Sequence, residues 1–224
     1  EMKHMTFYKW TQVFTIAVFG MVTIGMSPNV YSARVRPNVI MVMADDLGIG
    51  DISPTNPECK IRTPHLQKMA NEGITFLDAH SSSAVCTPTR YGLLTGRYNW
   101  RSRLGRGVLS GRSSHLIPAE RPTIGHLMRG GGYHTAMIGK WHLKAEPADF
   151  HYYCVLPGQG KYHNPEFRVR GEKPWGKNLV KFDGKHSTDA ITDLTLDWLQ
   201  AGWAQDKPFC LMHHYTAPHD YFDH

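Results

Sequence analysis

A continuous apolar run at residues 39–43, Val-Ile-Met-Val-Met, constrains the fold of this chain more than any other feature. Five apolar residues without polar alternation are typical of a strand that is covered on both faces. Such strands belong to parallel sheets with helices on either side. This run ends at Asp45 and Asp46. We therefore expect an α/β fold with an acidic pair at the end of its first strand.

Helical and strand-like segments alternate along the rest of the chain. The expected helices have start signals and apolar residues at helical spacing: residues 64–73 after Thr63, residues 123–128 before a glycine cluster, and residues 187–199 capped by Ser187. The expected strands are short β-favouring runs at residues 74–77, 133–138 and 208–215. Residues 144–186 are rich in Gly, Pro and aromatic residues and are expected to be irregular. This order implies a largely parallel sheet, flanked by helices, that binds ligands at the carboxyl ends of its strands.

The stretch Cys-Thr-Pro-Thr-Arg-Tyr-Gly-Leu-Leu-Thr-Gly at residues 86–96 has the pattern of a nucleophile at a helix start. Pro88 suits the first helical turn, where a missing N–H costs nothing. Arg90 then lies one turn after Cys86 on the same side. The positive end of the helix dipole favours an anion at this position. Taken alone, the stretch also fits a buried cysteine before an ordinary amphipathic helix.

The Cys-x-Pro-x-Arg pattern followed by Leu-Thr-Gly resembles the signature of the formylglycine-dependent sulfatases, in which a maturation enzyme oxidises that cysteine to an aldehyde. Residues 132–143, GYHTAMIGKWHL, resemble the second sulfatase signature, and residues 37–46, PNVIMVMADD, resemble the opening strand. Residues 156–167, LPGQGKYHNPEF, resemble a segment of bacterial sulfatases similar to those that act on 6-sulfated N-acetylglucosamine in glycosaminoglycans.

The resemblance implies an alkaline-phosphatase-like sandwich with a largely parallel central sheet flanked by helices. Residues 34–224 would form the N-terminal part of the catalytic domain. In this family a later Asp-Asn pair and a later lysine complete the site, and a smaller C-terminal domain follows. The sequence stops at His224 before any of these. We therefore expect a catalytic domain that is truncated before its C-terminal part.

The family chemistry addresses a specific obstacle, because the nucleophile must approach a sulfate ester that is itself an anion. The site needs cations, a strong nucleophile and a proton for the departing alcohol. The resemblance implies that one hydroxyl of the formylglycine hydrate at residue 86 attacks sulfur, and that the other later expels sulfate. It also implies that Asp45, Asp46 and the modified Cys86 bind Ca²⁺ through oxygen.

The same resemblance assigns roles to four further residues. Arg90 would hold the hydrate, Lys140 would contact sulfate and hydrate, His142 would assist proton movement, and His219 would protonate the leaving oxygen. Each of them also has an ordinary structural interpretation as a turn or strand residue. Lys140, His142 and His219 lie at or after the end of an expected strand, as the acidic pair does, and this favours one common site. The expected substrate is a sulfated carbohydrate such as 6-sulfated N-acetylglucosamine.

Two other functions remain open at this point. A phosphonate or phosphate ester hydrolase of the same superfamily can share the fold and even the modified cysteine. An inactive truncated fragment is the second alternative, because the missing segments would supply ligands for the cation and the sulfate.

The first 33 residues have the organisation of a secretory signal peptide. Lys3 and Lys9 precede an uncharged apolar run at residues 13–26, and small residues follow near Ser32. The run is short for a membrane span, although an uncleaved anchor is the alternative. We expect a signal peptide at residues 1–33, export to the periplasm or the medium, and no stable membrane span after cleavage.

Charge and cysteine content narrow the range of partners. The chain has 25 basic and 19 acidic residues and a net charge of +6, which suits a polyanionic substrate or a merely soluble basic surface. Zinc-finger spacing, RNP motifs and heptads are absent from the sequence, so nucleic acid is not an expected partner. The four cysteines show no CxxC pair, which argues against a zinc cluster. One disulfide among Cys59, Cys154 and Cys210 is possible in an oxidising compartment.

Overall fold

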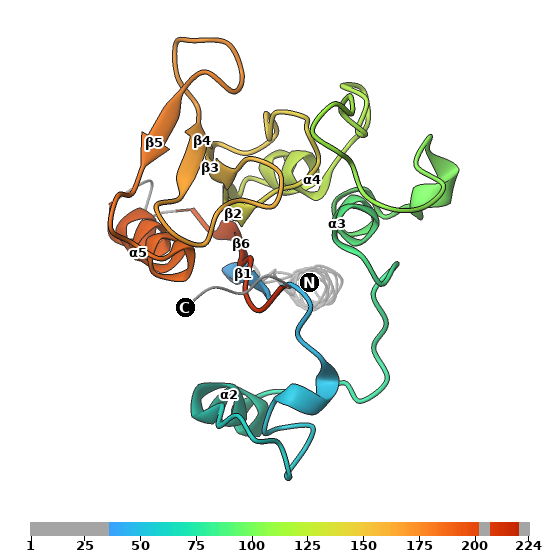
Figure 1. The fold of residues 1–224 in the computed structure, drawn as a ribbon, viewed down its shortest axis with the longest axis vertical. Helices are drawn as coiled ribbons and strands as arrows, with labels where there is room; N and C mark the ends of the chain where they lie inside the picture. Colours follow the sequence, from blue (N-terminus) through green and yellow to red (C-terminus); the bar gives the residue numbers. More distant parts are fainter. Residues whose placement is uncertain (1–35, 202–206, 220–224) are drawn as a thin grey trace, which may run out of the picture. The chain divides into compact units, whose positions relative to one another are not determined.

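The computed structural model describes residues 36–201 and 207–219, which form a mixed six-stranded sheet with helices on both faces (Figure 1). The strands are β1 (Val39–Met43), β2 (His134–Lys140), β3 (Tyr152–Leu156), β4 (Glu166–Val169), β5 (Leu179–Lys181) and β6 (Phe209–His214). Their order is β1-β6-β2-β3-β4-β5, and β1, β6, β2 and β3 are parallel to one another. β4 and β5 add an antiparallel edge. The expected signal peptide lies outside the described residues.

The parallel order places distant parts of the sequence at one edge of the sheet. β6 lies between β1 and β2, with His214 opposite both Met43 and Gly139. The chain after β6 is also tied to the end of β1, since the N–H of Tyr215 donates to the Met43 carbonyl at 2.8 Å. The loops that follow β1, β2 and β6 therefore start side by side.

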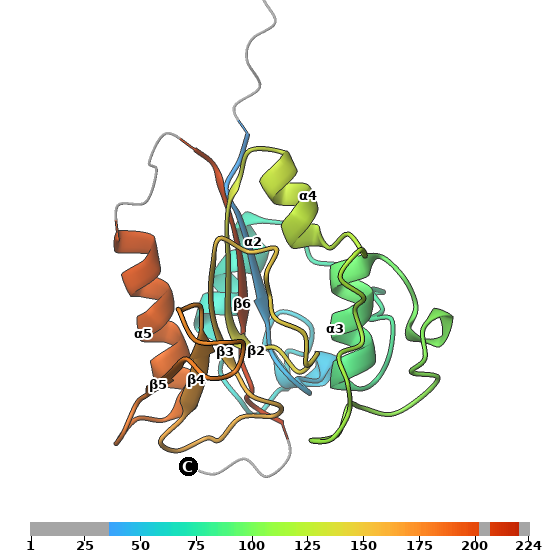
Figure 2. The same ribbon diagram turned by 90° about the horizontal axis from the view of Figure 1, so that it is seen from above.

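The four α-helices of the described residues lie where the sequence predicts helices, and two short 3₁₀ turns add to them. They are η1 (Ile49–Asp51), α2 (Pro64–Glu72), α3 (Cys86–Thr95), η2 (Asn99–Arg101), α4 (Ile124–Gly130) and α5 (Ser187–Gln200). Figure 2 shows α5 on one face of the sheet and α3 and α4 on the other. No helix among the described residues has both the length and the apolar character needed to cross a bilayer.

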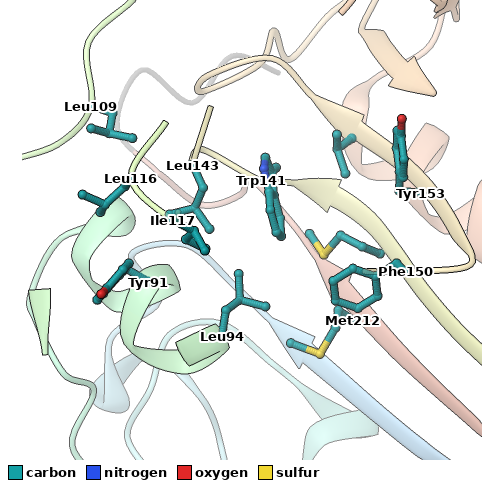
Figure 3. Close-up of a cluster of buried hydrophobic side chains, with 12 residues drawn as sticks. Tyr91, Leu94, Leu109, Leu116, Ile117, Trp141, Leu143, Phe150, Tyr153 and Met212 are labelled. Carbon is teal, nitrogen blue, oxygen red and sulfur yellow. The ribbon is translucent and has the colours of Figure 1, made fainter. Parts of the chain in front are cut away.

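Strand alternation divides the core into two clusters. Met137 of β2 belongs to one buried cluster with Tyr91 and Leu94 of α3, and Figure 3 shows Trp141 and Phe150 among the side chains of this cluster. Ile138, the next residue of β2, packs on the opposite face with Ile191 and Trp198 of α5 in the second cluster. Because neighbouring strand residues point to opposite faces, both faces of β2 are buried, as a parallel strand requires.

Helix α3 starts and ends as its sequence predicts. Val85 before it is extended, and Pro88 lies in the first turn, where a missing N–H is tolerated. Gly96 ends the helix at a left-handed φ of 64° and donates its N–H to the Gly92 carbonyl at 2.9 Å. These signals fix Cys86 as the first residue of the helix.

Several local predictions were wrong. Residues 74–77 form no strand and are exposed, because β-favouring residues need a neighbouring strand and none pairs with them. Residues 144–186 are not irregular throughout: they contain β3, β4 and β5, and β3 is part of the buried parallel sheet. His186 rather than Ser187 precedes α5, and its ring accepts from the Thr188 N–H. The sequence left one disulfide open, and the structure has all four cysteines, which lie in the described part of the chain, as free thiols.

Gly139 is the position at which the sheet tolerates no side chain. Its φ is +102°, and a Cβ there would overlap the carbonyl oxygen of His214 on β6. We expect Gly139→Ala to destabilise the complete gene product by about 3 kcal/mol or more, through backbone strain and overpacking. Thermal and denaturant unfolding would measure the loss. Gly111→Ala is the matched control, because Gly111 has open space around it and no positive φ. Similar losses in both variants would contradict the packing argument.

Candidate active site

A cavity of about 320 Å³ lies at the carboxyl ends of the strands. Its lining includes Asp45 and Asp46 after β1 and Cys86 and Arg90 of α3. The first turn of α3 therefore faces the end of β1, although some 40 residues separate them in sequence. This volume accommodates a small polar group, and the residues around it are charged or nucleophilic.

A buried cluster of three charges forms the base of the site. Oδ2 of Asp45 accepts from Nη2 of Arg90 at 3.0 Å and lies 2.5 Å from Nζ of Lys140. The exposed fractions of Asp45, Arg90 and Lys140 are 5%, 1% and 0%. Two cations thus share one carboxylate in a nearly dry environment, which leaves one positive charge in excess.

Burial and pairing act against each other on the pKa values of this cluster. Burial favours the neutral form of Asp45, but Lys140 and Arg90 outweigh it and lower the pKa of that carboxyl. Burial also lowers the pKa values of Lys140 and Arg90, and Asp45 opposes this shift only in part. The carboxylate is therefore firmly ionised. Burial of the two charged side chains, Lys140 and Arg90, costs desolvation free energy, and a bound anion would offset part of this cost.

Arg90 is held in place by the strands as well as by Asp45. Its Nη1 donates to the Lys140 carbonyl at 2.5 Å and to Nδ1 of His214 at 3.0 Å. Burial, and then the charge of Arg90, lower the pKa of His214 well below its usual range, so this ring is neutral. Because Nδ1 accepts, the ring proton lies on Nε2. Sequence reasoning missed His214, since a strand histidine has no motif that separates a structural from a functional role.

Cys86 faces a second neutral histidine. Its Sγ lies 3.1 Å from Nδ1 of His142, and Nε2 of that ring is 3.2 Å from the Leu109 carbonyl. The carbonyl can only accept, so Nε2 carries the proton and Nδ1 accepts from the thiol. Burial, followed by the charge of Lys140, lowers the pKa of His142 to about 4. His142 also has a left-handed φ of 53°, a strained conformation of the kind found at functional sites.

Asp46 and His219 form the exposed side of the site. Asp46 has a φ of 63°, and its side chain is about half exposed. Its Oδ2 lies 3.6 Å from Nε2 of His219. Asp45, Asp46 and His219 each place one ligand atom within 4.8 Å of the others, so a metal ion could be held between them.

Gln159 is a further site residue that sequence reasoning did not single out. Its Nε2 lies 3.3 Å from Nε2 of His219 and 4.0 Å from Sγ of Cys86. Gln159 follows β3, which was predicted to be part of an irregular segment. The available signal was the resemblance of residues 156–167 to a sulfatase segment, because Gln159 lies within it.

The structure brings all the sequence-predicted site residues to one edge of the sheet. They fall into three contacting groups: Asp45 with Arg90 and Lys140, Cys86 with His142, and Asp46 with His219. The amide of Gln159 connects the second group to the third. The individual roles of these residues stay predictions.

The two adjacent aspartates differ in what they contribute to stability. We expect Asp45→Asn to cost about 3–5 kcal/mol of unfolding free energy, because it leaves two buried cations without their carboxylate. Asp46→Asn should cost about 0.5 kcal/mol or less, since its carboxylate is half exposed and lies 3.6 Å from His219, and asparagine tolerates a left-handed φ. Denaturant unfolding of the complete gene product in the presence of a chelator would measure both. Equal costs would show that Asp45 is not the centre of the buried cluster.

Comparison with known proteins agrees with this geometry. The family model described as sulfatase matches residues 37–224. An N-acetylglucosamine-6-O-sulfatase of Bacteroides thetaiotaomicron is 35% identical over 189 residues, which cover 82% of this chain and 31% of the relative. Human steryl-sulfatase is 42% identical over 120 residues, which cover 50% of this chain and 20% of the relative.

Solved structures show the same relationship. A protein in complex with its substrate D-glucosamine-2-N,6-O-disulfate superposes with a TM-score of 0.70 at 34% identity, over 83% of this chain and 35% of that chain. The chain thus spans about a third of the length of these relatives. The mostly parallel sheet flanked by helices is the predicted alkaline-phosphatase-like fold. A family model that covers residues 37–224 and a relative that is 35% identical over 82% of the chain lead to one conclusion, that this chain belongs to the sulfatase family.

Proposed function

We propose that the complete gene product hydrolyses the sulfate ester of a carbohydrate, with 6-sulfated N-acetylglucosamine as the leading candidate. The buried cluster of Asp45, Arg90 and Lys140 is the observation that carries this proposal. Its excess positive charge lies beside Cys86 at the start of α3, where the helix dipole adds to the attraction for an anion. A sulfate ester is an anion with three oxygens that would accept hydrogen bonds from such donors.

The nucleophile in this proposal is formylglycine at residue 86, made from the cysteine by a maturation enzyme. Water adds to this aldehyde to give a hydrate with two hydroxyls. One hydroxyl would attack sulfur and displace the sugar alcohol, and deprotonation of the other would expel sulfate as the aldehyde re-forms, which an unmodified thiol cannot do. The chain holds this position rigidly, because Thr87 next to it donates to the His142 carbonyl at 3.2 Å and accepts from the Leu109 N–H. Neutral His142 has Nδ1 directed at residue 86, so it can take a proton from a hydroxyl there.

Ca²⁺ fits the donor set next to this residue. Asp45 and Asp46 offer hard carboxylate oxygens, which Ca²⁺ prefers, and both cation contacts of Asp45 use the same oxygen, Oδ2. An imidazole nitrogen is a poor Ca²⁺ ligand, so His219 fits a role towards the substrate better. Bound Ca²⁺ would offset the repulsion between two carboxylates and a sulfate anion. The modified side chain at residue 86 would be the third ligand from this chain.

Lys140 and His219 would act on different parts of the substrate. Lys140 is fully buried and paired with Asp45, and its ammonium group has further hydrogens that would donate to a sulfate oxygen. His219 lies on the exposed side of the site, where a leaving sugar oxygen would depart, and it can supply the proton to that oxygen. Gln159 and Tyr162 hold its loop: the Tyr162 hydroxyl donates to the His219 carbonyl at 2.9 Å.

The substrate class and the location follow from separate observations. The relative with 35% identity is an N-acetylglucosamine-6-O-sulfatase, and a similar solved structure contains a 6-O-sulfated glucosamine. Both favour a 6-sulfated hexosamine over an aryl sulfate as the natural substrate. The signal-peptide pattern of residues 1–33 supports export to the periplasm or the medium, where such glycans are met.

Modification of Cys86 and sulfatase activity should appear together. In a host that matures other sulfatases, peptide mass spectrometry should find the aldehyde at residue 86, and the complete gene product should turn over aryl sulfate. Cys86→Ala should abolish turnover, while Cys59→Ala should leave it unchanged, because Cys59 lies outside the site. Faster turnover of a phosphonate ester than of any sulfate would assign the protein to the related hydrolases instead. A persistent thiol at residue 86 would refute the proposed nucleophile.

The role of His219 can be tested through the leaving group. A sugar alcohol needs a proton far more than nitrophenolate does, so His219→Ala should slow sugar desulfation more than aryl sulfate hydrolysis, by about 100-fold. Steady-state kinetics on both substrates would give this ratio, with His65→Ala on the exposed surface of α2 as the control. Equal losses on the two substrates would assign His219 to sulfate binding.

A further inference from the structure

A polar groove of about 500 Å³ lies between the loop that follows β3 and the β4–β5 hairpin. Its volume is within the range of about 300–1,000 Å³ that is typical of small-molecule sites. The chain enters it through a tight turn in which the Gly160 N–H donates to the Pro157 carbonyl at 3.0 Å. Gly160 has a φ of 82°, and a Cβ there would press on Leu156, so the turn requires glycine. The groove is therefore part of a fixed loop structure.

Charge distinguishes this groove from the sulfate site. Its lining contains two lysines and two carboxylates, which are Lys161, Lys181, Glu166 and Asp183, together with the amides of Gln159 and Asn164. The buried cluster at the sulfate site has an excess of positive charge, whereas the charged groups in the groove cancel. A neutral ligand with many hydroxyls, which must both donate and accept hydrogen bonds, suits such a lining better than a second sulfate group does.

Two of the groove residues are available for a ligand. Lys181 pairs with Glu166 at 3.4 Å, and Asn164 accepts from the Gly184 N–H at 2.6 Å, so these three residues are already engaged. Lys161 and Asp183 are exposed and form no ion pair with any residue that the structure describes. One is a donor and the other an acceptor, which is the combination that a sugar ring can use.

Gln159 connects the groove to the reacting centre. It lines the groove, and its Nε2 lies 3.3 Å from Nε2 of His219 and 4.0 Å from Sγ of Cys86. Its Oε1 is buried and has no hydrogen-bond partner among the described residues. A buried amide oxygen without a partner is unfavourable, so this atom marks a place for a donor that a ligand would bring.

We propose that this groove is a saccharide subsite, which binds a pyranose ring of the glycan whose sulfate group is held beside Cys86. The inference rests on the proposed sulfate ester hydrolysis and extends it to the sugar. The ring would extend from the sulfate site past Gln159, with Lys161 and Asp183 contacting its hydroxyls. Gln159 would contact both parts of the substrate.

Kinetics on two substrates would test the subsite in the complete gene product. N-acetylglucosamine 6-sulfate has the sugar hydroxyls, whereas p-nitrophenyl sulfate shares only the sulfate. Lys161→Ala and Asp183→Ala should each raise KM for the sugar about 10-fold, the effect of losing one charged hydrogen bond, and leave aryl sulfate kinetics within about 2-fold. Gln159→Ala should impair both substrates. Lys177→Ala and Glu172→Ala are matched controls, because both residues are exposed in the connection between β4 and β5 and do not line the groove.

The outcomes separate this inference from the proposed function. Unchanged sugar KM in both groove variants, or equal effects on sugar and aryl sulfate, would overturn the subsite while sulfatase activity stood. If the unaltered protein with an aldehyde at residue 86 hydrolysed neither sulfate, the proposed function would fail first. Calorimetry with unsulfated N-acetylglucosamine would then test sugar binding in the groove independently of sulfatase activity. Binding that is lost in Lys161→Ala would support the subsite, and absence of binding to the unaltered protein would overturn it.

Discussion

The buried contact of Asp45 with Arg90 and Lys140 is the interaction on which the rest of the site depends. Removing three charges from water is expensive, and only close pairing with further hydrogen bonds makes it tolerable. These partners come from the loop after β1, from α3 and from the end of β2, so the cluster exists only when the sheet has its native order. His214 on β6 completes it by accepting from Arg90. The fold and the site therefore depend on each other, because the strand order that forms the core also brings the charged side chains into contact.

Two neutral histidines lie beside this cluster without adding to its positive charge. Burial is the main reason that His142 and His214 are uncharged, and the nearby cations add to it. A protonated ring at either position would put another positive charge in a dry site that already has one in excess. In the neutral form each ring offers a nitrogen that accepts, His214 from Arg90 and His142 from residue 86. In the proposed mechanism, the site would then combine a strong attraction for an anion with a base next to residue 86.

Sequence reasoning located the candidate site residues better than it located the strands. The motifs around Asp45, Cys86 and Lys140 lie at element boundaries, where capping and strand ends leave local signals, so these residues were placed correctly at one edge. β3, β4 and β5 were missed because Gly, Pro and aromatic residues in residues 144–186 carry loop signals, and their pairing is decided by distant strands. Because β3 was not predicted, the sequence could not show that Gln159, which follows this strand, lies near the other site residues, or that a groove lies beside it.

The adjacent aspartates show what neither motif nor periodicity can decide. Asp45 and Asp46 are identical in type and both follow β1, yet one is 5% exposed and the other about half exposed. The difference arises in the backbone, because the N–H of Asp45 donates to the Ala217 carbonyl at 3.2 Å and continues the alignment with β6, whereas Asp46 turns into a left-handed conformation. That turn directs one carboxylate towards the buried cations and the other towards His219 and solvent. A hard cation bound by both would therefore lie at the boundary between the buried cluster and the open side of the site, where the proposed substrate anion would arrive.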